Sequence, residues 1–291
     1  MASGNCVLCG APVRSKGEHV FPTWFLKRYD GQGPFTISVG GKPVAKRNGK
    51  VERDQMSRVM LPVCGSDSRN DCNKRLNDVF ENPGKPQVRA VLDDLQPITG
   101  SEVLPFVRWV AKTLVLHAHP LARDSEIGLL NIEGRRPLVL PESLLRTMRD
   151  TAMLPDDLSL WMGVVDPDGA PVAMPEFEPI HLPDVDRPDG VGGESGGTLL
   201  GFSLPGDKQV LFQLLFHPLC DVSNPFESAG LMTRLWPAPP AVLDITALPV
   251  LDEEAGSIMG QWVVTGGISI SLQPGERWPD CATMKAFSAL S

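Results

Sequence analysis

The sequence predicts an α+β protein with a small metal-bound domain at residues 1–88 and a larger α+β domain at residues 89–291. Two observations support this division. Four of the six cysteines fall in the first part, where their spacing is typical of metal ligands. The second part shows helical and strand patterns in turn and holds most of the acidic residues. The length of the chain is sufficient for two such domains.

Charge is distributed unevenly along the chain. The 291 residues have a net charge of −8. Residues 1–90 hold 15 lysines and arginines against 8 acidic residues, a net of +7, and residues 91–291 hold 12 against 27, a net of −15. A basic region attracts phosphates and an acidic region repels them. We therefore expect the N-terminal domain to contact nucleic acid, with a solvated basic surface that has no partner as the alternative.

Composition indicates a soluble globular protein, with 42% hydrophobic and 21% charged residues. No apolar run reaches the length of a membrane helix, and the first residues lack the charged and apolar regions of a signal peptide. Cys220 and Cys281 are far apart and are interpreted as ordinary thiols. These features predict a protein of the reducing cytoplasm.

Local patterns predict the elements of the N-terminal domain. We expect strands within residues 5–20, a short helix at 22–29, a hairpin at 35–45 around Gly40-Gly41 and a strand at 57–63. Trp24 is expected to pack in a small core. A helix is predicted from Cys72 to Glu81, ended by Asn82-Pro83-Gly84, and residues 83–86 are interpreted as the link to the second domain.

The second domain begins with helical patterns and continues with strands. Helices are expected at 88–95, 102–117 and 141–149, and the second of these has the clearest helical spacing of apolar residues. Strands are expected at 158–165, 210–216, 262–264 and 268–272. Residues 166–208 are rich in proline, glycine and aspartate, and the glycine-rich segment at 192–197 within them predicts a mobile loop.

Basic residues of the first domain are candidate phosphate contacts. A run between residues 42 and 58 is predicted to lie along a phosphate backbone, although a solubilising hairpin is nearly as good an interpretation. Two further basic residues stand at the start of the helix that follows Cys72. The candidate contacts are Lys42, Lys46, Arg47, Lys50, Lys74 and Arg75.

The four N-terminal cysteines predict a structural zinc site. Cys6 and Cys9 are separated by two residues, so that one tight turn presents both sulfurs to a single ion. Cys64 and Cys72 provide the second pair, with seven residues between them. This loop is longer than the usual two to four residues.

Between the cysteine pairs stands Gly17-Glu18-His19-Val20-Phe21-Pro22. Neighbouring side chains of an extended segment point in opposite directions, so that Glu18 can face a metal while His19 faces a water. Asn73 begins the helix after the last cysteine and directs its amide toward Glu18. Asn77 shares its helical face. A hard cation held by carboxylate and amide oxygens beside a histidine base is the minimal equipment for cutting a phosphodiester.

These motifs, CxxC, then Glu-His-Val-Phe-Pro, then Cys-Asn, resemble the zinc-bound branch of the HNH (ββα-metal) endonuclease family over residues 5–83. The resemblance implies a ββα-metal fold, a structural Zn2+ on the four cysteines, and a catalytic Mg2+ or Mn2+ held by Glu18 and Asn73. It implies that His19 is the general base, and that the protein is of bacterial or phage origin. Two features depart from the pattern: the Cys-x7-Cys pair, and the lack of an asparagine in the strand at 57–63.

Three functional hypotheses follow. The first is a metal-dependent endonuclease acting on DNA, or alternatively RNA, whose acidic C-terminal domain provides specificity, a ligand site, a homo-oligomer contact or a surface for a regulatory partner. The second is an inactive zinc-bound module that binds nucleic acid or protein. The third is an HNH-like fold recruited to other small-molecule chemistry.

Overall fold

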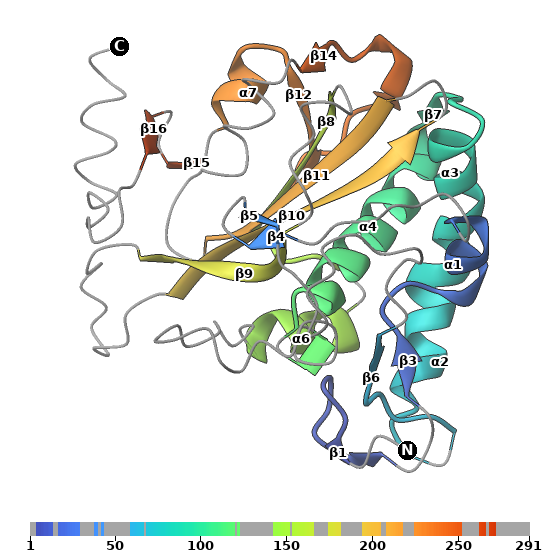
Figure 1. The fold of residues 1–291 in the computed structure, drawn as a ribbon. Coiled ribbons are helices and arrows are strands. Elements are labelled where there is room, and N and C mark those ends of the chain that lie inside the picture. Colours follow the sequence, from blue (N-terminus) through green and yellow to red (C-terminus); the bar gives the residue numbers. More distant parts are fainter. Residues whose placement is uncertain are drawn as a thin grey trace.

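The structure is a computed structural model that describes residues 4–13, 17–29, 38–39, 42–43, 59–66, 68–119, 121–122, 142–151, 153–165, 174–181, 194–204, 208–217, 224–251, 262–265 and 268–271. Helices and sheets are mixed along the chain (Figure 1), which confirms the α+β class. None of the helices in these ranges has the length and apolar content needed to cross a membrane.

A six-stranded sheet forms the centre of the C-terminal part (Figure 1). Its strands are β8 (Leu158–Val165), β9 (Met174–His181), β10 (Glu194–Leu204), β11 (Lys208–Phe216), β12 (Met232–Trp236) and β14 (Val250–Leu251). The order is β12-β8-β11-β10-β9, all antiparallel, and β14 pairs with β8 in parallel. The predicted strands β8 and β11 are confirmed.

The prediction of a mobile loop at 192–197 is wrong from Glu194 onward, because β10 begins there, and β9 is a second strand in the stretch 166–208 for which no strand was predicted. Strand β10 includes Gly196 and Gly197 from the segment that was interpreted as a glycine-rich loop, and it pairs with β11 from Gly196 to Leu204. Glycine lowers the intrinsic strand preference of a segment, but cross-strand pairing overrides it. At Gly201 the missing side chain also gives room to Leu211 of the neighbouring strand, which would lie 2.9 Å from a Cβ.

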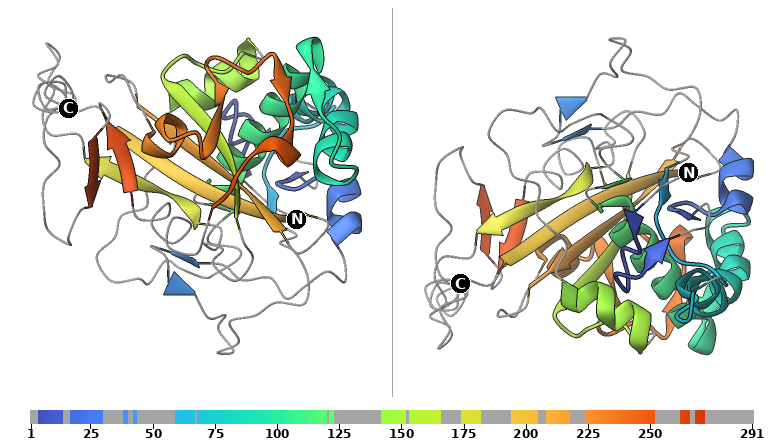
Figure 2. Two further views of the ribbon diagram at one scale, coloured as in Figure 1. Left: turned by 90° about the horizontal axis from the view of Figure 1, so that it is seen from above. Right: turned by 90° about the horizontal axis from the view of Figure 1, so that it is seen from below.

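Helix α4 (Val103–His117) lies between this sheet and helix α3 (Asn82–Leu92) (Figures 1 and 2). It confirms the long helix predicted at 102–117. Phe106 packs on Phe212 of β11 with ring centroids 6.0 Å apart, and Trp109 packs on Phe202 of β10 at 6.5 Å. Because both sides of the helix are covered, its only lysine, Lys112, is fully buried.

A continuous helical run extends from Cys72 to Leu92. It consists of α2 (Cys72–Leu76), a π-helical turn η1 (Asn77–Glu81) and α3 (Asn82–Leu92). The predicted end of the helix at Asn82-Pro83-Gly84 is therefore wrong. Pro83 stands in the first turn of α3, where it is well tolerated. Gly84 faces α4, and a Cβ on it would lie 2.6 Å from the Cβ of Trp109.

The predicted domain boundary between residues 88 and 89 falls inside α3. Apolar side chains from both sides of this position belong to one core that extends from Cys6 to Ile245. In the N-terminal part, Phe21 and Phe25 stack on one another and pack on Phe202 of β10, with ring centroids 6.0 and 5.1 Å away. The described residues thus share one core across the predicted boundary.

The remaining elements are short. The N-terminal part contains β1 (Gly4–Asn5), β2 (Pro12–Val13), β3 (Glu18–His19), α1 (Thr23–Tyr29), β4 (Ser38–Val39), β5 (Lys42–Pro43) and β6 (Met60–Leu61). The C-terminal part adds β7 (Ile98–Thr99), η2 (Gly100–Glu102), α6 (Glu142–Asp150), α7 (Pro225–Ser228), β13 (Val242–Leu243), η5 (Ile245–Ala247), β15 (Trp262–Thr265) and β16 (Ile268–Ser271). Helices α1 and α6, the hairpin β4–β5 and strands β6, β15 and β16 lie where the sequence predicts them.

Candidate functional site

The four N-terminal cysteines meet in one cluster. Cys6 and Cys9 lie in the turn between β1 and β2, whereas Cys64 follows β6 and Cys72 begins α2. Their sulfur atoms all lie within 4.8 Å of one another, and the Cys9 and Cys64 sulfurs are 3.7 Å apart. Sulfurs on a tetrahedral ion with bonds of about 2.3 Å are separated by about 3.8 Å. The cluster therefore has the dimensions of a four-thiolate metal site.

Burial and charge both favour a cation at this cluster. None of the four thiols forms a disulfide, and all except Cys9 are buried. Burial raises the pKa of the Cys72 thiol, and the nearby Cys6 raises it further by charge repulsion. A bound cation offsets such repulsion and keeps the ligands as thiolates. The four residues can thus hold a metal such as zinc.

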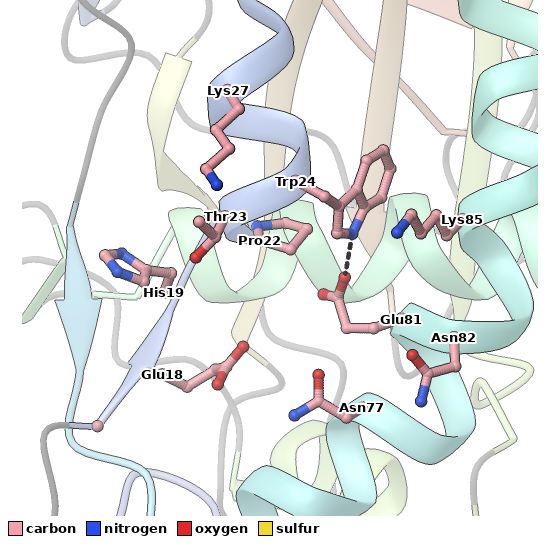
Figure 3. A pocket seen from close by; sticks show the side chains of 11 residues that line it. Glu18, His19, Pro22, Thr23, Trp24, Lys27, Asn77, Glu81, Asn82 and Lys85 are labelled. Atoms are coloured by element: carbon pink, nitrogen blue, oxygen red, sulfur yellow. Dashed lines mark hydrogen bonds between the residues drawn. The ribbon is translucent and has the colours of Figure 1, made fainter.

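Strand β3 presents Glu18 and His19 through its pairing with β6, in which Glu18 faces Leu61 and His19 faces Met60. Gly17, just before the strand, has a φ of 88° and approaches Leu61 so closely that a Cβ would overlap the Leu61 carbonyl oxygen. Only glycine combines this backbone conformation with this approach. Figure 3 shows the Glu18 carboxylate and the His19 imidazole pointing away from one another, as expected for neighbours in a strand.

Glu18 is linked to the start of the helical run by a chain of amides. The Asn73 side chain makes a hydrogen bond with the Glu18 carboxylate, and the Asn77 Nδ2 group donates to the Asn73 Oδ1 atom over 2.8 Å. Burial raises the pKa of Glu18, while the positive charge of Lys112 and the Asn73 bond act in the opposite direction. The structure thus brings together Glu18 and Asn73, the two expected ligands of a hard cation.

Glu18, His19 and Asn77 line a cavity of about 490 Å3, whereas Asn73 lies behind Glu18 and Asn77 and is not part of the lining. Glu18 and His19 come from β3, and the facing wall is formed by one side of η1 and the first turn of α3 (Figure 3). The full lining is Gly17, Glu18, His19, Pro22, Thr23, Trp24, Lys27, Asn77, Glu81, Asn82 and Lys85. Carboxylate and amide oxygens therefore meet an imidazole and two ammonium groups in one open site.

A buried network forms the back of the cavity. Glu81, at the end of η1, makes an ion pair with Lys112 of α4, and both side chains are buried. The Glu81 Oε2 atom also accepts from the indole nitrogens of Trp24 over 3.4 Å and Trp109 over 3.3 Å. The Lys112 ammonium donates to the Val20 carbonyl oxygen over 3.4 Å. Together these bonds connect η1, α1 and the segment that follows His19 with α4.

The π-helical turn determines which side chains reach the cavity. The Asn82 amide donates to the Asn77 carbonyl, one residue further back than in an α-helix, and such turns are frequent at functional sites. Asn77, Glu81 and Lys85 are four residues apart and share one face. Sequence reasoning missed Glu81, Lys27 and Lys85. Two features of the sequence could have pointed to this region. One is the repeat of polar residues every four positions from Asn73 onward, and the other is a single lysine, Lys112, within an apolar helix.

Two of the candidate phosphate contacts, Lys74 and Arg75, interact with other groups of the protein. Lys74 is exposed and pairs with Asp78 one turn later. The Arg75 Nη2 atom donates to the Asp150 carbonyl oxygen over 2.7 Å, at the end of α6. Lys42 lies in β5, and Lys46, Arg47 and Lys50 lie outside the described residues. Their role in binding nucleic acid stays a prediction.

Comparisons of the chain with protein-family models, with curated proteins and with solved structures find no match. The resemblance to HNH endonucleases consequently rests on the motif residues and their placement in this fold. It is the basis of a proposal about function.

Proposed function

We propose that the protein is a metal-dependent HNH-type endonuclease that hydrolyses phosphodiester bonds, with DNA as the substrate. The observation that carries the proposal is the approach of the Asn73 side chain to the Glu18 carboxylate, next to a four-cysteine cluster and beside the cavity that Glu18 and His19 line. A carboxylate and an amide oxygen that can hold a cation, together with a histidine base, are groups that metal-dependent phosphodiester hydrolysis can use.

In this proposal the four-cysteine cluster holds Zn2+ as a structural ion. Cys72 is a ligand and Asn73 is the next residue, so that the metal fixes the start of α2. The backbone N–H of Asn73 also donates to the Cys64 carbonyl oxygen over 2.9 Å. Four protein ligands leave no open position for a substrate. The role of this site is to hold the catalytic residues in place.

Glu18 and the Asn73 side-chain oxygen would hold Mg2+ or Mn2+ at the inner side of the cavity. The Asn73 oxygen has two lone pairs and gives one to Asn77, so that the other can reach a cation. When bound, the ion would supply positive charge against the phosphate oxygens and the leaving oxygen. Burial raises the pKa of the Glu18 carboxyl and the nearby charge of Lys112 opposes that rise, and a bound cation would further favour the ionised form.

His19 acts as the general base in this proposal. Its imidazole lies on the opposite side of β3 from the Glu18 carboxylate (Figure 3), so that it can take a proton from a water without binding the cation. A neutral imidazole is the effective base near neutral pH. Removal of the imidazole is therefore expected to stop the chemical step while leaving the fold unchanged.

The test is cutting of plasmid DNA and of RNA with Mg2+, with Mn2+ or with EDTA. Wild type is expected to cut DNA only with a divalent metal. His19→Ala is expected to lose at least a hundredfold in rate, the usual contribution of general base catalysis being about 10²–10⁴. His119→Ala is the matched control and should cut normally. If wild type cuts nothing under any condition, or if His19→Ala cuts normally, the endonuclease proposal fails and the binding-module hypothesis replaces it.

A further inference from the structure

Two lysines stand at the edge of the cavity without a carboxylate partner. Lys27 comes from α1 and Lys85 from α3, and both line the cavity with Trp24 between them (Figure 3). Among the described residues, neither forms an ion pair. The Lys85 ammonium lies 5.6 Å from the centroid of the Trp24 ring, at the distance of a cation–π contact.

The two carboxylates of the cavity are already engaged elsewhere. Glu81 is paired with Lys112 and accepts from Trp24 and Trp109, so that both of its oxygens have donors. Glu18 is bonded to Asn73. The cavity consequently has its negative charge at the back and its unpaired positive charge at the edge. A ligand that matches both regions combines a bound cation with an anion of phosphate chemistry.

Trp24 holds one of these lysines in place. Its indole nitrogen donates to Glu81 over 3.4 Å, and its ring packs on Trp109 at 5.8 Å between centroids. Because Trp109 and Glu81 belong to the buried network, the Trp24 ring is a rigid surface for the Lys85 ammonium. The exposed Arg89 guanidinium lies over the same ring at 5.9 Å, which adds a third positive charge at this edge.

We propose that Lys27 and Lys85 bind backbone phosphate oxygens of the nucleic-acid strand and place its scissile phosphodiester in the cavity that Glu18 and His19 line. This inference rests on the proposed function and specifies the part of the cavity that holds the substrate. The two ammonium groups are positioning groups. They bind phosphates in any sequence, because phosphate contacts carry no base information.

The test measures binding separately from cutting. A short fluorescently labelled DNA duplex of mixed sequence is titrated with the full-length protein in Ca2+ in place of Mg2+, and gel analysis verifies that the duplex stays intact. Lys27→Gln and Lys85→Gln are each expected to weaken binding about eightfold at about 0.1 M salt, because one fewer counterion is released. The slope of log affinity against log salt should fall by about one for each lysine. Lys208→Gln, an exposed lysine at the start of β11 outside the cavity, removes the same charge and should bind like wild type.

A nucleoside monophosphate at equal phosphate concentration is the second probe. The duplex is expected to bind more tightly, because it offers several phosphates to both lysines. If the monophosphate binds wild type as tightly as the duplex, and both substitutions weaken the two probes alike, the cavity holds a single phosphate ester and the strand-binding inference is overturned.

The inference and the proposed function fail in different ways. Suppose that wild type cuts no substrate, whereas Lys27→Gln and Lys85→Gln each weaken duplex binding and lower the salt slope. The endonuclease proposal then fails and the lysine site stands. If His19→Ala abolishes cutting but the double variant Lys27→Gln/Lys85→Gln binds with the affinity and salt slope of Lys208→Gln, the lysine site is overturned and the endonuclease proposal stands.

Discussion

The four-cysteine cluster and the Glu18 cavity are neighbouring parts of one structure, joined by the helical run that begins at Cys72. The cluster is closed: its ligands are thiols from three chain segments, and three of the four are buried. The cavity is open, and its ligands are oxygens supported by amides and by a buried ion pair. The first arrangement suits a permanent soft ion and the second suits an exchangeable hard ion and a substrate. Stability should therefore depend on the first, and chemistry on the second.

The largest effect is expected from removal of the metal at the cysteine cluster. Cys72→Ser, or treatment of wild type with a chelator, should unfold the segment around β1, β2 and α2, because the short strands there bury little apolar surface. Elemental analysis and circular dichroism with and without chelator provide the measurement. Cys220→Ser, which leaves Cys6, Cys9, Cys64 and Cys72 intact, should retain the metal. A protein purified without chelator that contains no metal would contradict this prediction.

Next in size is the buried ion pair behind the cavity. Lys112→Met should lower the free energy of unfolding by about 3–5 kcal/mol, because the Glu81 carboxylate is left charged and buried. The double variant Glu81→Gln/Lys112→Met keeps an acceptor for the two tryptophans and should recover most of this loss. Urea unfolding gives the comparison.

The exposed pair Lys74–Asp78 is the matched control for this experiment. Lys74→Met should cause no measurable change, because exposed ion pairs contribute little. If Lys74→Met lowers the free energy of unfolding as much as Lys112→Met does, burial does not determine how much an ion pair contributes to stability.

A smaller loss is expected at the crossing of α3 and α4, which holds the two sites together. Gly84→Ala should lower the free energy of unfolding by about 1–3 kcal/mol, because the added methyl group meets the Cβ and ring of Trp109. Gly4→Ala adds the same group where no atom lies within 4 Å and should be neutral. If the midpoint of urea unfolding is unchanged in Gly84→Ala, α3 and α4 lie further apart in the protein than in this structure.

The smallest change in stability is expected at Glu18 itself. Its pKa is raised in the folded protein, mainly by burial, so that the folded state holds a proton at pH values where the unfolded state has lost it. Wild-type stability should therefore fall as the pH rises through the raised pKa. Glu18→Gln should lack this pH dependence and be at least as stable as wild type at neutral pH, while losing metal-dependent cutting. A marked destabilisation at neutral pH would make Glu18 a structural residue.

Much of the candidate site could be predicted from the sequence, because its signals are local. The CxxC spacing, the adjacent acid and histidine, and an asparagine directly after a cysteine each depend on a few neighbouring residues. The helix over residues 102–117 was equally clear, since its apolar residues repeat with the helical period. Glu81 could not be recognised in this way. Its partners Trp24, Trp109 and Lys112 are 57, 28 and 31 residues away.

The sequence by itself determined the α+β class and the four candidate metal-ligating cysteines, because ligand spacing and side-chain periodicity are properties of short segments. The proximity of Glu18 and Asn73, which are 55 residues apart, was predicted from the resemblance to the HNH motif and not from a local pattern. Only the tertiary structure decided that Pro83 and Gly84 lie inside a helix, that residues 174–181 and 194–204 form strands, and that one core crosses the predicted boundary. In each case a long-range contact outweighs a local preference: the crossing at Trp109 requires glycine, and pairing with β11 extends a glycine-containing segment. Local propensities amount to less than about 1 kcal/mol per residue, and the burial of a single large apolar side chain exceeds that.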